Sequence, residues 1–238
     1  MPLLLAFHGA GGSGPGMAPY SGLTRVADQS GFVVAYPSAA APRHVWTLRE
    51  TEDDRVPGGD DVSFTRQLID RLESQLCIDA RRVSAAGVSN GGGFVARLGC
   101  ELSDRLAGIV IVAGGFSSLS ACTPGRALSV LEIHGTDDPV VPYGGRAGAG
   151  AVPAWLHDWR VRDGCPAAHW QGRAAQRVRR FVWGPCRAGV VVEHLRISGG
   201  KHQWPGAEPA DPGPPSTFSA ALEAWRFLAP RHLTPAAR

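Results

Sequence analysis

The sequence predicts an α/β fold, in which a mostly parallel sheet is covered by helices on both faces. Short, continuous apolar runs recur along the chain, and segments with helical spacing separate them. The chain has 238 residues, of which 44% are hydrophobic, so it can bury one sizeable core. We therefore expect residues 1–238 to form a single domain.

The expected strands are apolar runs that end at glycine or polar residues. Residues 3–7 are apolar throughout and end at His8, as a buried strand that opens into a loop would. Residues 177–180, Arg-Val-Arg-Arg, place one valine among arginines, which is typical of a strand with one exposed face. In chain order, the apolar strands are expected at residues 3–7, 32–36, 83–88, 109–113, 128–134 and 190–197.

The expected helices repeat apolar residues every three or four positions. Asp60 and Asp61 stand where helix N-caps stand, and five apolar residues follow at helical spacing. These are Phe64, Leu68, Ile69, Leu72 and Leu76. The other helices are expected at residues 22–29, 92–102, 155–161 and 218–227. In such a fold the loops at the C-terminal ends of the strands form the site.

The composition argues against several classes of partner. The net charge of +3 comes from arginines scattered along the chain, so we expect no nucleic-acid partner. No stretch approaches the roughly 20 apolar residues that cross a bilayer, so we expect no membrane segment. Residues 1–7 are too short and too uncharged for a signal peptide. None of the five cysteines forms a Cys-x-x-Cys pair, so no metal site is expected.

The strongest local motif is Gly87-Val-Ser-Asn-Gly91, which lies between the expected strand 83–88 and the expected helix 92–102. A strand that turns directly into a helix strains the intervening serine, so small residues must flank it. The turn exposes the Ser89 hydroxyl near the positive end of the helix. This context predicts the nucleophile turn of the α/β-hydrolase fold. The alternative interpretation is a purely structural turn.

A nucleophilic serine needs a histidine to accept its proton and a carboxylate to orient that histidine. In the α/β-hydrolase fold both follow the serine, the carboxylate first. Asp137 and Asp138 both follow the expected strand 128–134, and the local sequence leaves the choice between them open. His202 lies in a glycine-rich loop after the last apolar strand and is the expected base. We expect His134 to pack beneath the loop that follows its strand.

Two backbone N–H groups are expected to stabilise the oxyanion. One belongs to Asn90, directly after the nucleophile, and the other to Ala10, the third residue of His8-Gly-Ala-Gly-Gly12. No Walker pattern supports a phosphate site instead. Trp46 and Trp204 flank the site motifs and are candidates for substrate binding, with core packing as the alternative.

Five motifs stand in order between Pro2 and about Gly206. They are His8-Gly-Ala-Gly-Gly12, Gly59-Asp-Asp-Val62, Gly87-Val-Ser-Asn-Gly-Gly92, His134-Gly-Thr-Asp-Asp-Pro-Val-Val-Pro-Tyr143 and Gly199-Gly-Lys-His-Gln-Trp-Pro-Gly206. Together they resemble the motifs of the polyhydroxybutyrate depolymerase-like esterases, a group related to feruloyl and acetylxylan esterases.

The resemblance implies an α/β-hydrolase catalytic domain that cleaves small-molecule or polymeric esters without a cofactor. It implies a serine acyl-enzyme and short-chain, hydroxyalkanoate or aryl (feruloyl or acetyl) esters as substrates. The family's acid falls two residues before the valine pair, on Asp138, and its base falls on His202. An acyltransferase or peptidase of the same fold is the alternative, since it would use the same residues. A non-catalytic binding module is a third interpretation.

The chain departs from the family in one respect. Family members usually carry an export signal and further strands before the strand that leads to the oxyanion loop, whereas this chain begins inside that strand. We therefore expect the first strands of the fold to be missing and strand 32–36 to lie at an exposed edge. The resemblance implies secretion or a periplasmic location, and the lack of a signal peptide leaves a cytoplasmic location open.

Cys165 and Cys186 are expected to form a disulfide. Cys165 follows the expected helix 155–161 and Cys186 follows the apolar residues 181–183, so a turn between them can bring both back to the sheet edge. At most one further bond can form among the others, which are Cys77, Cys100 and Cys122. The alternative is five reduced thiols in a cytosolic protein.

Overall fold

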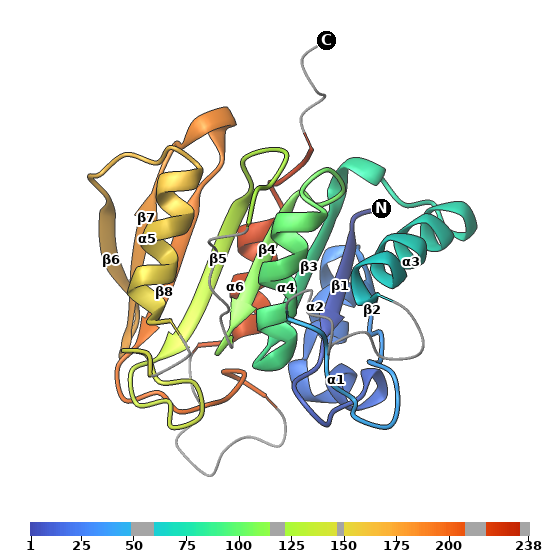
Figure 1. Ribbon diagram of the computed structural model, residues 1–238, viewed down its shortest axis with the longest axis horizontal. Coiled ribbons are helices and arrows are strands. Elements are labelled where there is room, and N and C mark those ends of the chain that lie inside the picture. The colour runs from blue at the N-terminus through green and yellow to red at the C-terminus, as the bar shows by residue number, and fades with distance from the viewer. Residues whose placement is uncertain (49–59, 115–121, 147–149, 208–217, 234–238) are drawn as a thin grey trace.

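The computed structural model describes residues 1–48, 60–114, 122–146, 150–207 and 218–233, and within them eight strands form one sheet (Figure 1). The strands are β1 (Leu3–Phe7), β2 (Val33–Ala35), β3 (Val83–Val88), β4 (Gly108–Val112), β5 (Ser129–Gly135), β6 (Trp170–Ala175), β7 (Val178–Trp183) and β8 (Val192–Ile197). Their order in the sheet is β2-β1-β3-β4-β5-β8-β7-β6. The strands from β2 to β8 in this order run parallel, and β7 is antiparallel to both β8 and β6.

Helices cover both faces of the sheet. They are α1 (Gly14–Ser21), α2 (Leu23–Ser30), α3 (Asp61–Gln75), α4 (Asn90–Glu101), α5 (Val152–Arg162) and α6 (Ala220–Leu228). Helices α3, α4 and α5 share one hydrophobic core with the sheet, and α1, α2 and α6 share the other (Figure 1). None of these described helices has the length and apolar character of a membrane span. The predicted fold class, a mostly parallel sheet between two helical layers, is therefore confirmed.

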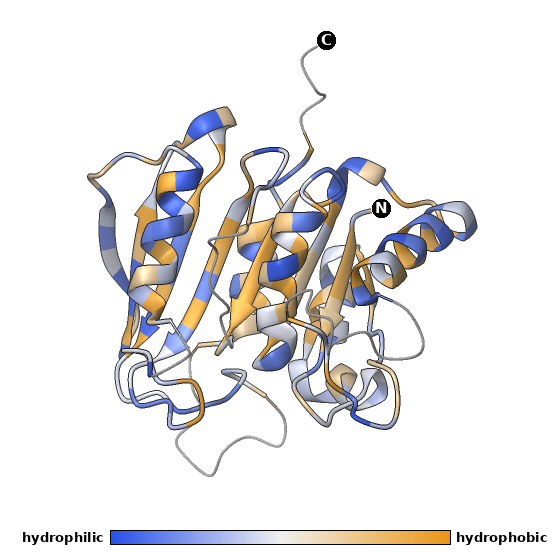
Figure 2. Cartoon of the chain, in the orientation of Figure 1, coloured by the Kyte–Doolittle hydropathy of each residue, from blue (hydrophilic) through white to orange (hydrophobic). Residues whose placement is uncertain are grey.

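Strand β1 shows why the inner strands are apolar at every position. Leu3, Leu5 and Phe7 point into the core with α3 and α4, whereas Leu4 and Ala6 point into the core with α1 and α2. Figure 2 shows the same hydrophobic character in the inner strands of the sheet. A fully buried leucine contributes roughly 1.5–3 kcal/mol to the free energy of unfolding. A strand that is apolar on both faces is therefore most stable between two layers of helices.

Two elements were not predicted. Helix α1 contains two glycines and two prolines, so its composition resembles a loop. It forms because the Ser13 side chain accepts a hydrogen bond from the Gly16 N–H and because a proline in the first turn loses no helical hydrogen bond. Strand β6 has little apolar alternation and pairs only with β7, at the end of the sheet. The other elements lie where expected, with ends shifted by a few residues.

Strand β2 lies at the opposite end of the described sheet and pairs with β1 alone. Its three residues are half-buried. Just before it, the Phe32 ring stacks on Trp225, with ring centroids 3.9 Å apart. The sheet edge predicted at residues 32–36 is therefore present in the described part of the chain.

Two disulfides brace the loops around the sheet. The predicted bond between Cys165 and Cys186 is confirmed, and a second bond joins Cys100 to Cys122. Cys77 is exposed and is not disulfide-bonded. In the chain-entropy model, loops of this size contribute roughly 3 kcal/mol each to the free energy of unfolding.

The topology gathers the predicted site residues at one edge of the sheet. Strands β1, β3, β5 and β8 are parallel, and each is followed by a loop that carries one of the predicted motifs. Since the C-terminal ends of parallel strands lie at the same edge, segments far apart in the sequence meet there.

Candidate active site

Ser89 occupies the tight turn between β3 and α4. Its backbone has φ 56° and ψ −120°, a conformation that costs a non-glycine residue about 1–3 kcal/mol. Its N–H donates to Val112 O at 2.9 Å and its carbonyl accepts from Gly93 N–H at 3.0 Å, so both sides of the turn are anchored. A Cβ at Gly87 would lie 2.3 Å from Gly91 O, and a Cβ at Gly91 would lie 2.4 Å from the backbone of β1. The glycines of the motif are thus required by close packing.

His202 lies between Ser89 and Asp138. Its Nε2 is 2.9 Å from Ser89 Oγ, and its Nδ1 is 2.8 Å from Asp138 Oδ2. The second oxygen of Asp138 accepts hydrogen bonds from the Val140 and Val141 N–H groups, both at 2.8 Å. Hydrogen bonds therefore hold both oxygens of the Asp138 carboxylate, and the carboxylate in turn holds the His202 ring.

The loops after β5 and β8 are tied together, which sets the position of His202. Asp137 N–H donates to Gly200 O at 3.0 Å, and Gly199 N–H donates to Thr136 Oγ1 at 2.8 Å. A Cβ at Gly135 would lie 2.1 Å from Gly200 O, so the close approach requires glycine there. The glycines that made this segment look like a loop in the sequence are what allow the two loops to pack together.

The two predicted oxyanion donors belong to the residue directly after Ser89 and to a residue, Ala10, that lines the same cavity as Ser89. Asn90 is the first residue of α4, so its N–H has no acceptor within the helix. The loop after β1 packs against the serine, because a Cβ at Gly9 would be 3.3 Å from Ser89 Cβ. None of the hydrogen bonds found among the described residues uses the N–H of Ala10. Both donors are thus available to a ligand atom near Ser89 Oγ.

His8 holds this loop and was not singled out from the sequence as a functional residue. Its Nε2 accepts a hydrogen bond from Ala39 N–H at 3.0 Å, so Nδ1 carries the proton and donates to Gly9 O at 2.7 Å. Burial lowers the pKa of His8, which favours this neutral form. The Gly9 carbonyl also accepts from Gly12 N–H at 3.0 Å. It belongs to the same peptide unit as the Ala10 N–H, so these bonds set the direction of that donor.

A cavity of about 780 Å³ opens at Ser89 and His202. Its other walls come from the loop after β1, from Met17 and Tyr20 of α1, and from His44. Helix α1, which was missed in the sequence, is therefore the main apolar wall beside the serine.

The two tryptophans predicted to bind substrate do not line this cavity, and the structure places both in the cores instead. Trp46 stacks on Phe94 with ring centroids 5.1 Å apart, and its Nε1 donates to His8 O at 3.1 Å. Its backbone exchanges two hydrogen bonds with the Asn90 side chain, at 2.7 and 3.0 Å. Trp204 packs in the core with α1, α2 and α6. Core packing, the alternative considered for each, is the arrangement observed.

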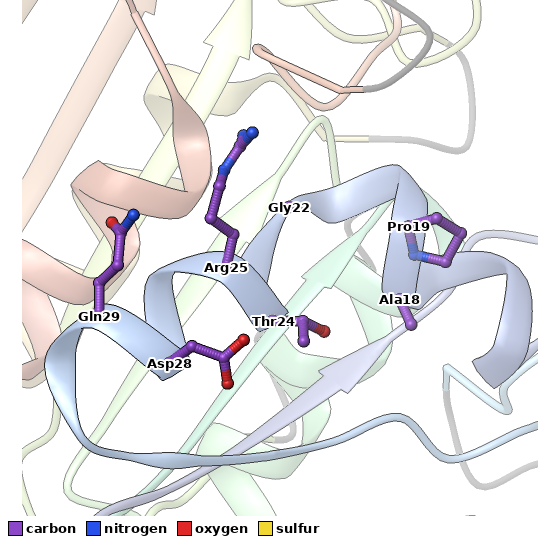
Figure 3. A pocket seen from close by; sticks show the side chains of 7 residues that line it. All are labelled: Ala18, Pro19, Gly22, Thr24, Arg25, Asp28 and Gln29. Carbon is purple, nitrogen blue, oxygen red and sulfur yellow. The ribbon is translucent and has the colours of Figure 1, made fainter.

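A second cavity, of about 510 Å³, lies on the outer side of α1 and α2 (Figure 3). It is lined by Ala18, Pro19, Gly22, Thr24, Arg25, Asp28 and Gln29. None of the residues of the Ser89 site contributes to it, so it is separate from the chemistry described above.

The geometry around Ser89 can support acyl transfer. A histidine placed 2.9 Å from the hydroxyl can take its proton, and a buried carboxylate can stabilise the resulting imidazolium. Two backbone N–H groups beside the hydroxyl can stabilise a negatively charged oxygen.

Comparisons with known proteins agree with this arrangement. A family model described as Esterase PHB depolymerase matches residues 1–153. A bifunctional acetylxylan esterase/xylanase of Neocallimastix patriciarum is 26% identical over 88% of this chain and 30% of its own length. A putative esterase of Nocardia uniformis subsp. tsuyamanensis is 32% identical over 86% of this chain and 66% of its own length. Feruloyl esterase B of Piromyces equi is 30% identical over 84% of this chain and 39% of its own length. The chain thus spans less than two thirds of each of these curated relatives.

Solved structures support the fold. An acetyl xylan esterase from Aspergillus awamori has a TM-score of 0.72 at 15% sequence identity, covering 96% of this chain and 88% of its own. A thermostable esterase has a TM-score of 0.61 at 17% identity, covering 98% of this chain and 55% of its own. At these identities the likeness shows the α/β-hydrolase fold alone. The family model, in contrast, matches well over half of the sequence, and the chain therefore belongs to the Esterase PHB depolymerase family.

Proposed function

We propose that the chain is one catalytic domain that hydrolyses carboxylic esters through a serine acyl-enzyme. Ser89 is the nucleophile, His202 the general base and Asp138 the orienting carboxylate. The observation that carries the proposal is the placement of His202, whose two ring nitrogens lie 2.9 Å from Ser89 Oγ and 2.8 Å from Asp138 Oδ2. Membership of an esterase family supports the same activity.

The reaction follows from this geometry. His202 Nε2 takes the hydroxyl proton as Ser89 Oγ attacks the ester carbonyl carbon, and the N–H groups of Ala10 and Asn90 bind the oxyanion. The C–O bond to the alcohol then breaks, and His202 returns the proton to the leaving oxygen. A water molecule, deprotonated by the same histidine, then attacks the acyl carbon. The bond between this carbon and Ser89 Oγ breaks, His202 returns the proton to Ser89 Oγ, and the acid is released. No cofactor takes part in these steps.

The substrates we propose are esters with short or aromatic acyl groups. A cavity of about 780 Å³ with Met17 and Tyr20 in its wall suits such a group. Acetylxylan and feruloyl esterases are named among the relatives, so acetyl and feruloyl esters of polysaccharides come first, and hydroxyalkanoate esters second. An acyltransferase or peptidase of the same fold remains the alternative function.

We also propose that the protein works outside the cytoplasm, either secreted or periplasmic. Two disulfides persist best in an oxidising compartment.

Replacement of the serine tests the activity. We expect Ser89→Ala to lower kcat on 4-nitrophenyl acetate and methyl ferulate by several orders of magnitude. It should also abolish labelling by a fluorophosphonate probe. Ser74→Ala, which alters an exposed serine on α3, is the matched control and should behave as the wild type. Retained activity in Ser89→Ala would overturn the proposal. Faster cleavage of the matching nitroanilide than of the nitrophenyl ester would favour a peptidase.

A further inference from the structure

Behind Asp138 lies a group of buried titratable side chains that the proposed reaction does not use. Glu132 and His134 are on β5, His194 is on β8, and Tyr143 is in the loop after β5. Glu132 is fully buried, as are both histidines. A carboxylate in the centre of a sheet is costly unless charged or hydrogen-bonded partners compensate it. Its partners therefore indicate what it does.

The four side chains form a continuous series of contacts that ends at Asp138. His134 Nε2 lies 3.3 Å from Asp138 Oδ2, and His134 Nδ1 lies 2.8 Å from Glu132 Oε1. The other oxygen of Glu132 lies 2.6 Å from His194 Nδ1. His194 Nε2 in turn lies 3.0 Å from the Tyr143 hydroxyl oxygen. The proposed orienting carboxylate is thus connected to a second buried carboxylate through one imidazole ring.

The acceptors around the rings fix the positions of the protons. His134 Nε2 faces Val141 O at 2.9 Å and Asp138 Oδ2, which are both acceptors, so this nitrogen carries a hydrogen. Among the described residues, His194 Nδ1 is hydrogen-bonded to the backbone oxygen of Glu132 at 3.3 Å and lies 2.6 Å from Glu132 Oε2, so it also carries a hydrogen. If Glu132 is ionised, His134 Nδ1 must donate to it as well, and the His134 ring is then an imidazolium.

The electrostatics of the pair favour this charged form. Burial by itself disfavours both charges, but the attraction of His194 and His134 lowers the pKa of Glu132 below its ordinary value. Burial likewise disfavours the imidazolium, but the Glu132 carboxylate, with a smaller contribution from Asp138, raises the pKa of His134. Both shifts therefore favour the ion pair over the neutral pair.

Two further groups face His134 from neighbouring elements. The Tyr143 ring meets it edge-on at 6.1 Å, and burial raises the pKa of this phenol, so it stays neutral. Arg196 is the partner of His134 in the β5–β8 register, and its guanidinium lies over the Phe181 ring at 5.2 Å. Neither group competes with Glu132 for the His134 Nδ1 proton, because a guanidinium has no acceptor and the phenol hydroxyl contacts His194.

We propose that His134 is a positioning residue of this enzyme: as a buried imidazolium anchored by Glu132, it holds the Asp138 carboxylate in place. The proposal rests on the proposed function, because it assigns a role behind the Ser89–His202–Asp138 set. His134 also binds Val141 O, in the turn whose N–H groups bind the other oxygen of Asp138. Its positive charge lies next to the carboxylate that orients His202, and we expect it to extend activity toward lower pH.

Glu132→Gln separates the charge from the hydrogen bonds. The glutamine NH₂ can donate to His134 Nδ1, and His194 Nδ1 keeps its hydrogen bond to the backbone oxygen at position 132, so both rings keep their contacts and His134 becomes neutral. The variant loses one negative and one positive charge, and the positive charge on His134 lies nearer to Asp138, so we expect the acidic limb of the kcat/KM profile to move upward. KM at the plateau should change by less than about twofold. A lower kcat with an unmoved acidic limb would reduce Glu132 to a structural role and overturn the proposal.

Tyr143→Phe is the matched control, because it removes a hydroxyl from the far end of the same network and leaves the Glu132–His134 pair intact. Its acidic limb should coincide with that of the wild type. If the acidic limb moved equally in Glu132→Gln and Tyr143→Phe, the cause would be a general loss of order in the network. That result would also overturn the proposal.

A spectroscopic test on the wild type does not depend on activity. In ¹⁵N-histidine NMR spectra of the wild type at pH 7, the His134 ring should show two protonated nitrogens, and His134→Gln provides the assignment. A neutral His134 ring would overturn the proposal whatever the kinetics. Should Ser89→Ala retain ester hydrolysis, the proposed function fails instead, while the protonation state of His134 can still be read.

Discussion

Asp138 and Asp137 are adjacent in the chain, yet the Asp138 side chain is fully buried against His202 whereas the Asp137 side chain is 56% exposed. Only Asp138 can therefore orient the histidine. We expect Asp138→Asn to lower kcat by about 10³–10⁴, because the wrong tautomer of His202 is then favoured. Asp137→Asn should stay within about threefold of the wild type. Steady-state kinetics on a nitrophenyl ester decide this, and the reverse order of effects would refute the assignment.

His8 sets the direction of the Ala10 N–H through its bond to Gly9 O. We expect His8→Ala to lower kcat by about 10–100-fold with little change in KM, since an oxyanion donor acts mainly in the transition state. His8→Asn can restore the donor to the Gly9 carbonyl and should recover part of the loss. Kinetics of both variants test this role. Wild-type kcat in His8→Ala would show that the loop needs no such support.

Trp46 should matter for stability rather than for substrate affinity. Its ring packs on Phe94 in the core, and its N–H donates to His8 O. Trp46→Phe removes that donor and leaves a small cavity, so we expect the free energy of unfolding to fall by about 1–3 kcal/mol. KM for methyl ferulate should be unchanged. Urea titration and kinetics together test this. A raised KM at unchanged stability would show that Trp46 contributes to substrate binding instead.

The contrast between Trp46 and Ser89 shows what the sequence could and could not predict. The Ser89 turn and the histidine follow from motifs whose context the alternating strands and helices fix, whereas the choice of Asp138 over Asp137 rested on the family resemblance. A tryptophan beside a motif carries no such information, because a core and a binding site favour the same apolar ring. Helix α1 was missed because its glycines and prolines conceal a capped helix. Glu132 was missed because one of its partners, His194, lies on another strand, 62 residues away in sequence.

The Cys165–Cys186 bond should stabilise the fold without taking part in catalysis. It closes a loop that contains β6 and β7, at the end of the sheet beyond β8. We expect the double variant Cys165→Ala/Cys186→Ala to lose about 2–4 kcal/mol in the free energy of unfolding and to keep its kcat. Cys77→Ala, at the free and exposed thiol, is the control and should leave stability unchanged. Full alkylation of both cysteines without reduction, in protein from an oxidising host, would contradict the bond.

Asp163 should make the protein less stable as the pH rises. It is fully buried at the end of α5, and burial raises its pKa from 3.8 to about 6, against the opposing effects of Leu128, Trp159, Arg187 and Arg162. Between these two pKa values the folded chain binds a proton that the unfolded chain has released, so the free energy of unfolding falls as the pH rises through that window. An asparagine side chain at this position cannot ionise. We therefore expect Asp163→Asn to be about 1–3 kcal/mol more stable than the wild type at pH 7.5 and to differ little from it near pH 4. Urea titrations at the two pH values measure the difference directly. An equal effect of the substitution at both would show that Asp163 does not titrate between them, and a loss of stability at pH 7.5 would show that its charge is compensated in the fold.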